Sequence, residues 1–479
     1  MKRLNIIIIL AVWLAFGSCQ GWLTVEPKDM ATKDKMFSSE LGFTTALTGL
    51  YLDLQNQYAP TGFLMGGSLE QMANNYMTPT STSNEYKFYT HNYRDDEEVE
   101  ATISAVFLKY YKIIANANTL IEALKSQTVL KQDLANLIEG EAYAIRAFCH
   151  FELLRLWGPV PTKVSASQLY LPYVTQVSSA DYPYHTYDQY VGFMKADFDH
   201  AVELLSQSDP ILEYPNSSLN TSYASISKYS DMFWYYRQKR FNVYGVKALQ
   251  ARLALWTGDK TTAYNLAKEV VEAKNTDGTS KFTLGTSADA TAYYPDRLFF
   301  KEHLVGVDIY NFRDQAGVFN GRFASYGNNN AKINQTLFEG QTELRTSLFV
   351  QSFSFSMGAI YCTTKYLNMT DTDYNYPKSV PLIRLSELYF ILIETAPLAE
   401  ANAYYKTFRE ARNASQVTLT ENNRINEVVK EYVREFYSEE QSFFVHKRLG
   451  LGSLLLSGAA MTDDKYMLPI PNDELVGAK

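Results

Sequence analysis

Residues 139–161 read EGEAYAIRAFCHFELLRLWGPVP, and this stretch predicts a helix buried in the core of the fold. At 100° per residue it carries one apolar stripe, with further apolar side chains on its other sides. The stripe comprises Leu134, Leu137, Ile138, Ala142, Ile145, Phe148, Cys149 and Leu156, and the other apolar residues are Ala147, Phe151, Leu153, Leu154 and Trp157. Such a helix packs between other helices, and Gly158, Pro159 and Pro161 end it.

Around this stretch, segments of helical periodicity alternate with long polar segments. Apolar residues spaced by three and four predict a helix from Ile103 to Leu124, which should pair antiparallel with the buried helix across a short loop. Further helices are expected at 41–54, 187–205, 243–256, 381–396, 398–412 and 424–437, and another follows a turn at Gly258 and Asp259. The proline-containing connection 159–185 is expected to run extended over the surface.

Helix pairs in which small alanines face aromatic residues resemble degenerate tetratricopeptide (TPR) repeats. The predicted fold is therefore all-α in the main, with TPR-like helix pairs at about 103–157, 187–273 and 381–437 as a scaffold. Residues 58–100 and 275–378 are rich in Gly, Asn, Ser, Thr and Tyr, and should form a large, irregular, loop-rich part on the ligand side.

The N-terminus has the pattern of an export signal. Lys2 and Arg3 precede an apolar run over 4–16, which is shorter than the about 20 residues that span a membrane. Gly17, Ser18 and Cys19 follow and resemble a bacterial lipobox, in which the cysteine becomes the acylated first residue. We therefore expect residues 1–18 to be a lipoprotein signal peptide and 19–479 a single domain anchored through lipid on Cys19. The alternative is an ordinary signal peptide with Cys19 free.

The composition limits the partners. The 479 residues carry a formal charge of -8, which makes nucleic acid an improbable ligand. Only three cysteines are present, so no disulfide framework is indicated.

Taken in order, several short motifs resemble the SusD/RagB-like family of nutrient-binding outer-membrane lipoproteins. The motifs are Cys19 with Trp22-Leu23 and Pro27; Tyr111 to Asn118; Arg146-Ala147 through Trp157-Gly158 to Pro161; Ala248 through Gly258; Arg384, Glu387 and Tyr389 through Glu394; Glu431, Glu435 and Phe436 with Phe443-Phe444 and Lys447-Arg448; and Leu468 to Pro471. Each motif is weak, but together they span nearly the whole mature chain. The residues at 16, 438–440 and 275–378 depart from the family pattern.

The resemblance implies a SusD-like fold and a non-catalytic, cell-surface protein that binds oligosaccharide or polysaccharide for nutrient uptake and polysaccharide utilization. It also implies a partner, a SusC-like TonB-dependent outer-membrane barrel that the lipoprotein covers as a lid. Two alternatives stay open: an exported glycoside hydrolase, and a TPR-type adaptor or assembly lipoprotein without a small ligand.

The residues themselves give little support to catalysis or to a cofactor. The six histidines are scattered without metal-ligand spacing, and nucleophile-elbow, phosphate-loop and dinucleotide motifs are missing from the sequence. Glu141 and Glu152 lie about 16 Å apart along a helix, too far for a glycosidase pair, and are expected to bond neighbouring segments. Asp371, Asp373 and Asn375 begin like a calcium loop, but Tyr376 and Leu382 stand where it needs Gly and Glu. No catalytic residue, metal site or cofactor is therefore predicted.

The positive signal for ligand binding is aromatic, because 36 Tyr, 27 Phe and 5 Trp make up 14% of the chain. Sugar rings stack their C–H faces on aromatic rings while their hydroxyls bond polar side chains. Aromatic and amide residues in polar loops are the candidates: Asn74, Asn75, Tyr76, Tyr93, Trp234, Tyr235, Tyr236, Tyr293 and Tyr294. The cluster at 234–236 is expected to be the most exposed.

Overall fold

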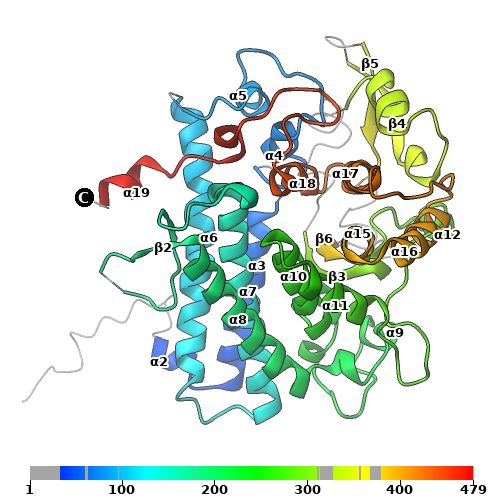
Figure 1. The fold of residues 1–479 in the computed structure, drawn as a ribbon. Coiled ribbons are helices and arrows are strands. Elements are labelled where there is room, and N and C mark those ends of the chain that lie inside the picture. The colour runs from blue at the N-terminus through cyan, green and yellow to red at the C-terminus, as the bar shows by residue number, and fades with distance from the viewer. Residues whose placement is uncertain are drawn as a thin grey trace, which may run out of the picture.

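The computed structural model describes residues 33–59, 63–94, 96–178, 180–309, 312, 327–354, 358–366 and 379–477. These residues form a mainly α-helical molecule, as predicted, with three two-stranded antiparallel sheets among them (Figure 1). Cys19 and the segment from Asp371 to Asn375 lie outside the described residues.

The first part of the chain supplies the long helices. In order it contains α2 (Lys33–Met36), α3 (Glu40–Gln57), α4 (Ser68–Met72), α5 (Asn84–Thr90), α6 (Glu97–Leu124), α7 (Gln132–Trp157), β1 (Leu169–Pro172), β2 (Tyr184–Thr186), α8 (Tyr187–Ser208), α9 (Asn216–Leu219), α10 (Val243–Trp256) and α11 (Lys260–Val271).

The second part mixes shorter helices with strands. It contains α12 (Ser287–Ala290), β3 (His303–Asp308), the π-helical segment η6 (Ala331–Leu337), β4 (Phe349–Ser354), β5 (Gly358–Thr363), β6 (Ser379–Arg384), α15 (Leu385–Thr395), α16 (Leu398–Ala411), α17 (Arg424–Glu435), α18 (Gln441–Leu449) and α19 (Asn472–Gly477). Short 3-10 turns connect several of these, including η3 (Met232–Trp234) and η4 (Arg237–Lys239).

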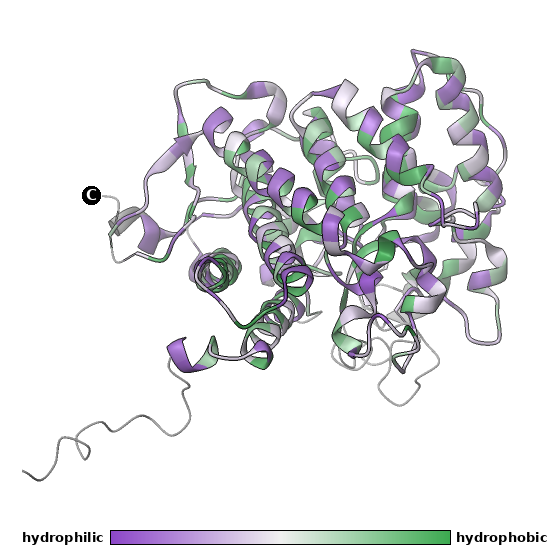
Figure 2. Ribbon diagram, turned by 90° about the horizontal axis from the view of Figure 1, so that it is seen from below, coloured by the Kyte–Doolittle hydropathy of each residue, from purple (hydrophilic) through white to green (hydrophobic). Residues whose placement is uncertain are grey.

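Helix α7 is the central element, as its sequence predicts. It packs against α6, α8, α3 and α10, and 22 of its 26 residues are buried. Burying one large aliphatic side chain contributes about 1.5–3 kcal/mol, so this helix concentrates much of the apolar stabilisation. Seen from below, the hydrophobic residues of the long helices gather on the sides that face other helices (Figure 2).

Local signals set the helix ends. Asp96 caps α6 by accepting hydrogen bonds from the backbone amides of Glu98 and Val99, and Thr186 forms a capping box with Gln189 at the start of α8. Gly258 has φ +83° and turns the chain between α10 and α11, which confirms the predicted turn. Each of these caps satisfies backbone amides that have no partner within the helix.

The predicted helix at 381–396 is wrong at its start. Residues Ser379–Arg384 form β6, which pairs antiparallel with β3, and the helix α15 begins only at Leu385. Both strands are buried on both faces and are therefore apolar at nearly every position. In the sequence, such a continuous apolar run cannot be distinguished from the start of a buried helix. Gly245 lets α10 approach β3, since a Cβ there would lie 2.3 Å from Val305 Cγ2.

The connection 159–185 also differs from its prediction. It folds into the β1–β2 hairpin, and Leu171 to Val174 are buried against α6 and α8 rather than extended over the surface. Tyr111 donates a hydrogen bond to Pro172 O and Asn118 donates one to Val174 O. These long-range bonds cannot be read from the local pattern.

Candidate functional site

A groove lies where the loop between α5 and α6, the β1–β2 hairpin and the C-terminal segment meet, and these elements are on the left side of Figure 1. It consists of two cavities of about 640 and 440 Å³ that share Tyr93, Arg94 and Pro469, and we call it the Arg94 groove. The larger cavity is also lined by His91, Asn92, Trp157, Gln168, Leu169, Tyr170, Tyr184, Asp464, Met467, Leu468 and Ile470, and the smaller by Asp96, Glu97, Glu100 and Asn472.

The loop between α5 and α6 forms one wall. His91 ends α5 in the left-handed region at φ +60°, and its Nε2 donates a hydrogen bond to Met72 O at 2.8 Å. Burial lowers the pKa of His91 to about 4, so its ring is neutral at neutral pH. Tyr93 is buried and donates a hydrogen bond to Lys465 O at 3.0 Å. Arg94 then follows as an exposed residue.

The C-terminal segment forms the opposite wall and is fixed to the end of α7. Trp157 Nε1 donates to Pro469 O at 2.9 Å, and the amide of Leu468 donates to Leu156 O at 3.1 Å. Buried Lys447 donates to the carbonyl oxygens of Arg155 at 2.7 Å and Gly158 at 2.8 Å, which satisfies this helix end. Burial lowers the pKa of Lys447 well below its usual value. The wall is therefore built on the core helix.

The β1–β2 hairpin closes the larger cavity. Tyr184 donates a hydrogen bond to Glu474 Oε1 at 3.1 Å, and burial, followed by the charge of Glu474, raises the pKa of Tyr184 to about 12. Tyr170 accepts a hydrogen bond from the amide of Ser165 at 3.0 Å, and Leu169 beside it is exposed. The hairpin thus contributes an apolar and aromatic floor.

Several polar side chains in the Arg94 groove are not used by the protein itself. Within the described ranges, no hydrogen bond or ion pair is made by the side chains of Asn92, Arg94 or Gln168. Asp464 lies beside them at the surface. A sugar ring has an apolar C–H face and hydroxyl groups at its edge. Planar polar side chains beside apolar and aromatic residues can contact both.

A second groove runs along α3. Two cavities of about 450 and 440 Å³ share Thr48 and Phe233, and we call them together the α3 groove. Its lining is Glu40, Leu41, Thr44, Thr45, Leu47, Tyr51, Leu52, Gln55, Leu134, Asp231, Trp234, Tyr236, Lys239, Arg240, Val307 and Asp308. Its cations already have partners: Lys239 pairs with Asp308 at 2.8 Å and Arg240 with Glu141 at 2.8 Å. The α3 groove is more apolar than the Arg94 groove, and both of its cationic side chains form ion pairs within the protein.

The structure separates the aromatic and amide residues that the sequence singles out. Tyr93 lines the Arg94 groove, and Trp234 and Tyr236 line the α3 groove. Tyr293 and Tyr294 project from a separate loop, 88% and 44% exposed, with their rings nearly perpendicular at 4.8 Å. No single surface unites these residues.

The remaining candidates are buried and bonded within the fold. Asn74 donates to Gln71 O and Tyr89 O, and Asn75 donates to Glu70 Oε2 at 2.5 Å. The hydroxyl of Tyr76 lies 2.8 Å from Ser438 Oγ, and that of Tyr235 accepts from the amide of Ile226 at 2.7 Å. The expectation that 234–236 is the most exposed cluster is wrong, because Tyr235 is 1% exposed, Trp234 and Tyr236 are partly buried, and Tyr293 is the most exposed candidate.

The sequence interpretation did not select Arg94, Gln168 or Asp464. The signal available was weak: Arg94 follows the polar, tyrosine-bearing loop 78–93, and Asp464 precedes the Leu468 to Pro471 motif. Only the fold brings these distant segments to one groove.

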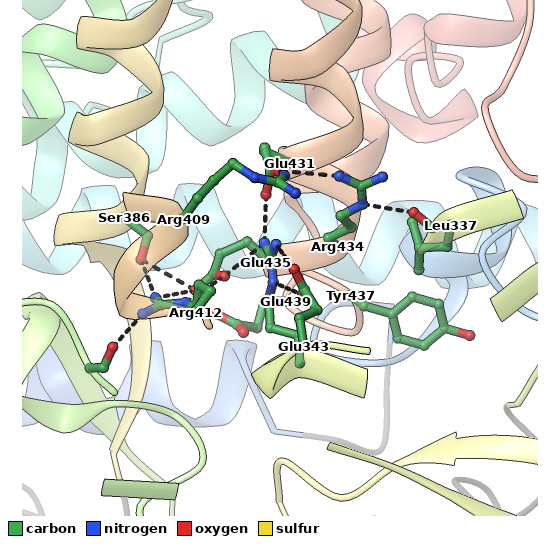
Figure 3. Close-up of polar contacts among 12 residues, drawn as sticks. Leu337, Glu343, Ser386, Arg409, Arg412, Glu431, Arg434, Glu435, Tyr437 and Glu439 are labelled. Carbon is green, nitrogen blue, oxygen red and sulfur yellow. Dashed lines mark hydrogen bonds and ion pairs between the residues drawn. The ribbon is translucent and has the colours of Figure 1, made fainter. Parts of the chain in front are cut away.

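The densest cluster of charged groups lies elsewhere and is buried (Figure 3). Glu435 Oε1 accepts from Arg384 and Arg412, each at 2.6 Å, and its Oε2 accepts from Arg345 at 3.2 Å. Burial acts to raise the pKa of Glu435, but the charges of Arg412 and Arg384 outweigh it and hold that pKa well below its usual range. We call this cluster the arginine–glutamate network.

The network extends through a second carboxylate. Glu431 accepts from Arg409 at 2.6 Å and from Arg345 at 2.7 Å, and Arg434 joins it at 3.1 Å. Its pKa is lowered to about 2, because the arginine charges outweigh the effect of burial. Every one of these side chains has a charged partner and is almost inaccessible to solvent, so the cluster is structural rather than catalytic.

The described ranges offer no metal-binding cluster and no membrane-spanning helix. Those residues contain no group of three His, Cys, Asp or Glu side chains arranged to hold a metal ion. None of the helices described is long and apolar enough for a membrane crossing. Glu141 bonds Arg237 of a neighbouring segment at 2.5 Å, as expected, whereas Glu152 bonds Arg155 on its own helix at 2.6 Å, which differs from the expectation.

Comparison with known proteins agrees with this architecture. Residues 22–230 match the SusD-like_3 family model, described as starch-binding and associating with the outer membrane. Two relatives from Formosa agariphila, SusD-like protein P38 and SusD-like protein P25, are 30% identical over 165 residues and 24% identical over 172. Each match covers 34% of this chain and only 31% of the relative.

Solved structures match over most of the chain. A SusD superfamily protein from Bacteroides thetaiotaomicron is 18% identical, with a TM-score of 0.66, over 90% of this chain and 97% of its own. Surface glycan-binding protein A from the same organism, in complex with laminarihexaose, is 16% identical, with a TM-score of 0.65, over 92% and 98%. A laminarin-binding SusD-like protein is 15% identical, with a TM-score of 0.64, over 92% and 98%.

The likeness to these structures shows that the chain has a SusD-type fold. Residues 22–230 are thus similar to the SusD-like_3 family, and the chain as a whole has the fold of the SusD superfamily structures.

Proposed function

We propose that this chain is a non-catalytic, cell-surface glycan-binding lipoprotein that holds an oligosaccharide in the Arg94 groove. The observation that carries the proposal is the set of polar side chains without protein partners in the described structure, Asn92, Arg94 and Gln168, above a floor that includes Leu169 and Tyr184. The two joined cavities suit an extended chain of sugar rings, and each falls within the about 300–1,000 Å³ typical of ligand pockets. Glycan binding by similarly folded proteins supports it.

The other surfaces with accessible aromatic rings are secondary candidates. The partly buried Trp234, which lines the α3 groove, favours that groove as a second glycan surface, with Tyr236 lining it as well. Tyr293 and Tyr294 form an exposed pair that a longer polysaccharide can contact. For Asn74, Asn75, Tyr76 and Tyr235 we propose a supporting role, because their polar groups are bonded inside the fold.

We propose further that export, lipid attachment at Cys19 and a SusC-like TonB-dependent transporter place the protein at the outer membrane. The lipobox-like residues Gly17 to Cys19 support the anchor, and the family match supports the location. Metabolic labelling with radioactive palmitate should mark the wild type and not Cys19→Ser. Purification of the tagged full chain from its native membrane should bring a β-barrel transporter with it. An unlabelled wild type would contradict the anchor.

Binding and turnover should be measured together. The full chain, purified in detergent, is mixed with laminarin, starch, xylan and mannan in separate affinity gels, and the glycans are then analysed for shortened products. We expect retardation by at least one glycan and unchanged chain length. Shortened glycan would support a hydrolase, and no retardation by any glycan would favour an adaptor without a small ligand.

A further inference from the structure

Resting on the proposed glycan-binding function, we infer that the Arg94 groove selects uncharged glycans and rejects glycans that carry carboxylate or sulfate groups. This goes beyond glycan binding in general, because it names the chemical class of the ligand from the charges along the groove.

The lining of the groove is unbalanced in charge. Its two cavities contain four carboxylates, Asp96, Glu97, Glu100 and Asp464, but a single arginine, Arg94. His91 adds no positive charge at neutral pH, since burial lowers its pKa to about 4. The carboxylates therefore outnumber the cations along the path proposed for the sugar.

The carboxylates are not fully neutralised by their surroundings. Asp96 lies 3.7 Å from Lys87 Nζ, and Glu100 accepts a hydrogen bond from the amide of Asn472, which removes no charge. No ion pair involves Glu97 or Asp464 within the described part of the chain. A hydrogen bond from Thr462 lowers the pKa of Asp464, which favours its charged form.

Other charges near the groove do not reverse this balance. Lys163 pairs with Asp463 at 2.7 Å, whereas Lys465 donates to Ala460 O at 2.7 Å and keeps its charge, so it adds one cation near the groove. Glu474 adds a further carboxylate beside Tyr184. An anionic sugar in the groove therefore meets several like charges, whereas neutral hydroxyls can donate hydrogen bonds to the same carboxylates.

The size of the effect follows from Coulomb's law. Two like charges about 6 Å apart in a water-like medium repel enough to weaken binding about threefold, so several carboxylates together should weaken it about tenfold or more. The repulsion should fade at 1 M salt, where the screening length is about 3 Å.

The test compares matched polymers. Laminarin, starch and mannan consist of hexoses and carry a C6 hydroxymethyl group, so the one of these three that retards the full chain most strongly is oxidised at C6 to its uronate. Both forms are titrated into the protein by calorimetry at low salt. Alginate and polygalacturonate serve as natural anionic probes. We expect the uronate to bind about tenfold more weakly than its neutral parent, and the ratio to approach 1 at 1 M salt.

A charge-neutralising variant localises the effect. Glu97→Gln should narrow the ratio of neutral to anionic affinity about threefold at low salt. Glu98→Gln is the matched control, because Glu98 is exposed on the same helix turn but does not line the groove, and it should change the ratio less than Glu97→Gln does.

The outcomes separate the inference from the function on which it rests. Equal or tighter binding of the uronate, with the neutral glycan still bound, would overturn the selectivity and leave glycan binding intact. An equal response of Glu97→Gln and Glu98→Gln would overturn the assignment to this groove. Failure of every neutral and anionic glycan to bind would remove the proposed function itself.

Discussion

Helices α7 and α17 are both largely buried, but the side chains that bury them differ in kind. Helix α7 contacts its neighbours mainly through aliphatic and aromatic residues, whereas α17 buries Glu431, Arg434 and Glu435 within the arginine–glutamate network. Apolar burial stabilises without directional requirements, while buried charges need every partner in place. Helix α7 also holds one such carboxylate, Glu141, which bonds Tyr51, Arg237 and Arg240, but its burial is mainly apolar, whereas that of α17 depends on the network.

The network also joins segments far apart in the chain. Glu435 and Glu302 both bind Arg384 and Arg412, and thereby connect α17, the turn before β3, the start of α15 and the end of α16. Arg345 adds the segment before β4. We therefore expect the loop-rich side to depend on the network for its position.

The largest effect should come from removing the charge at the centre of the network. Glu435→Gln leaves Arg384 and Arg412 without one carboxylate in a buried site, and should lower the free energy of unfolding by about 3–5 kcal/mol. Urea denaturation followed by circular dichroism measures it. Glu203→Gln, which is exposed on α8, is the control and should change stability by less than about 0.5 kcal/mol. A loss below about 1 kcal/mol for Glu435→Gln would show that the network is not critical.

A cavity in the apolar region should cost somewhat less. Leu153 is fully buried on α7, and Leu153→Ala should lower the free energy of unfolding by about 3 kcal/mol in the same assay. Leu108→Ala on α6, where the side chain is 58% exposed, should have little effect. Equal losses for the two leucine variants would contradict the assigned role of α7.

Acid distinguishes the two regions without mutation. Because the folded pKa of Glu431 is about 2 and that of Glu435 is also lowered, the stability that they contribute is complete above the unfolded value of 4.5 and is lost as the pH falls through it toward 2. Hydrogen exchange between pH 5 and pH 2.5 should show α17 losing protection before the middle of α7. If α17 and α7 lost their protection at the same pH, the two carboxylates would not set the acid stability of α17 separately from that of α7.

The sequence predicted the apolar helices better than the segments that are buried through charges or strand pairing. Periodicity identified α3, α6, α7, α8, α10, α16 and α17, because a helix buried on an apolar face reveals itself locally. It missed β6, whose identity depends on pairing with β3, and it gave no sign that Arg409 or Glu431 is buried. A charged residue on a helix has the same local pattern whether it faces solvent or a distant partner.

The candidate site was less predictable for a related reason. Aromatic composition indicated sugar binding and selected Tyr93, but it also selected Asn74, Asn75, Tyr76 and Tyr235, which the fold uses internally. Asn92, Arg94 and Gln168 stand out only because their side chains have no partners within the described structure, and Asp464 only because it faces them. Residues that lack partners can be identified only after all contacts are known.

The smallest expected effect on stability belongs to the groove. Arg94→Ala removes an exposed side chain that makes no ion pair in the described structure, so it should shift the free energy of unfolding by less than about 0.5 kcal/mol. Arg94→Ala should nevertheless weaken glycan binding strongly. A variant that loses binding but keeps its stability distinguishes the groove from the two buried regions, where substitutions lower stability.

The most direct test of the account is therefore a paired calorimetric titration of the tightest-binding neutral glycan into the full chain in detergent. Lys109→Ala, which removes an exposed cation on α6 away from the groove, serves as the matched control. We predict saturable binding by the wild type and Lys109→Ala, and at least about tenfold weaker binding by Arg94→Ala, because a charge-assisted hydrogen bond contributes about 1.5–3 kcal/mol. Unchanged affinity in Arg94→Ala, together with a tenfold loss in Trp234→Ala, would contradict the Arg94 groove and place the glycan in the α3 groove.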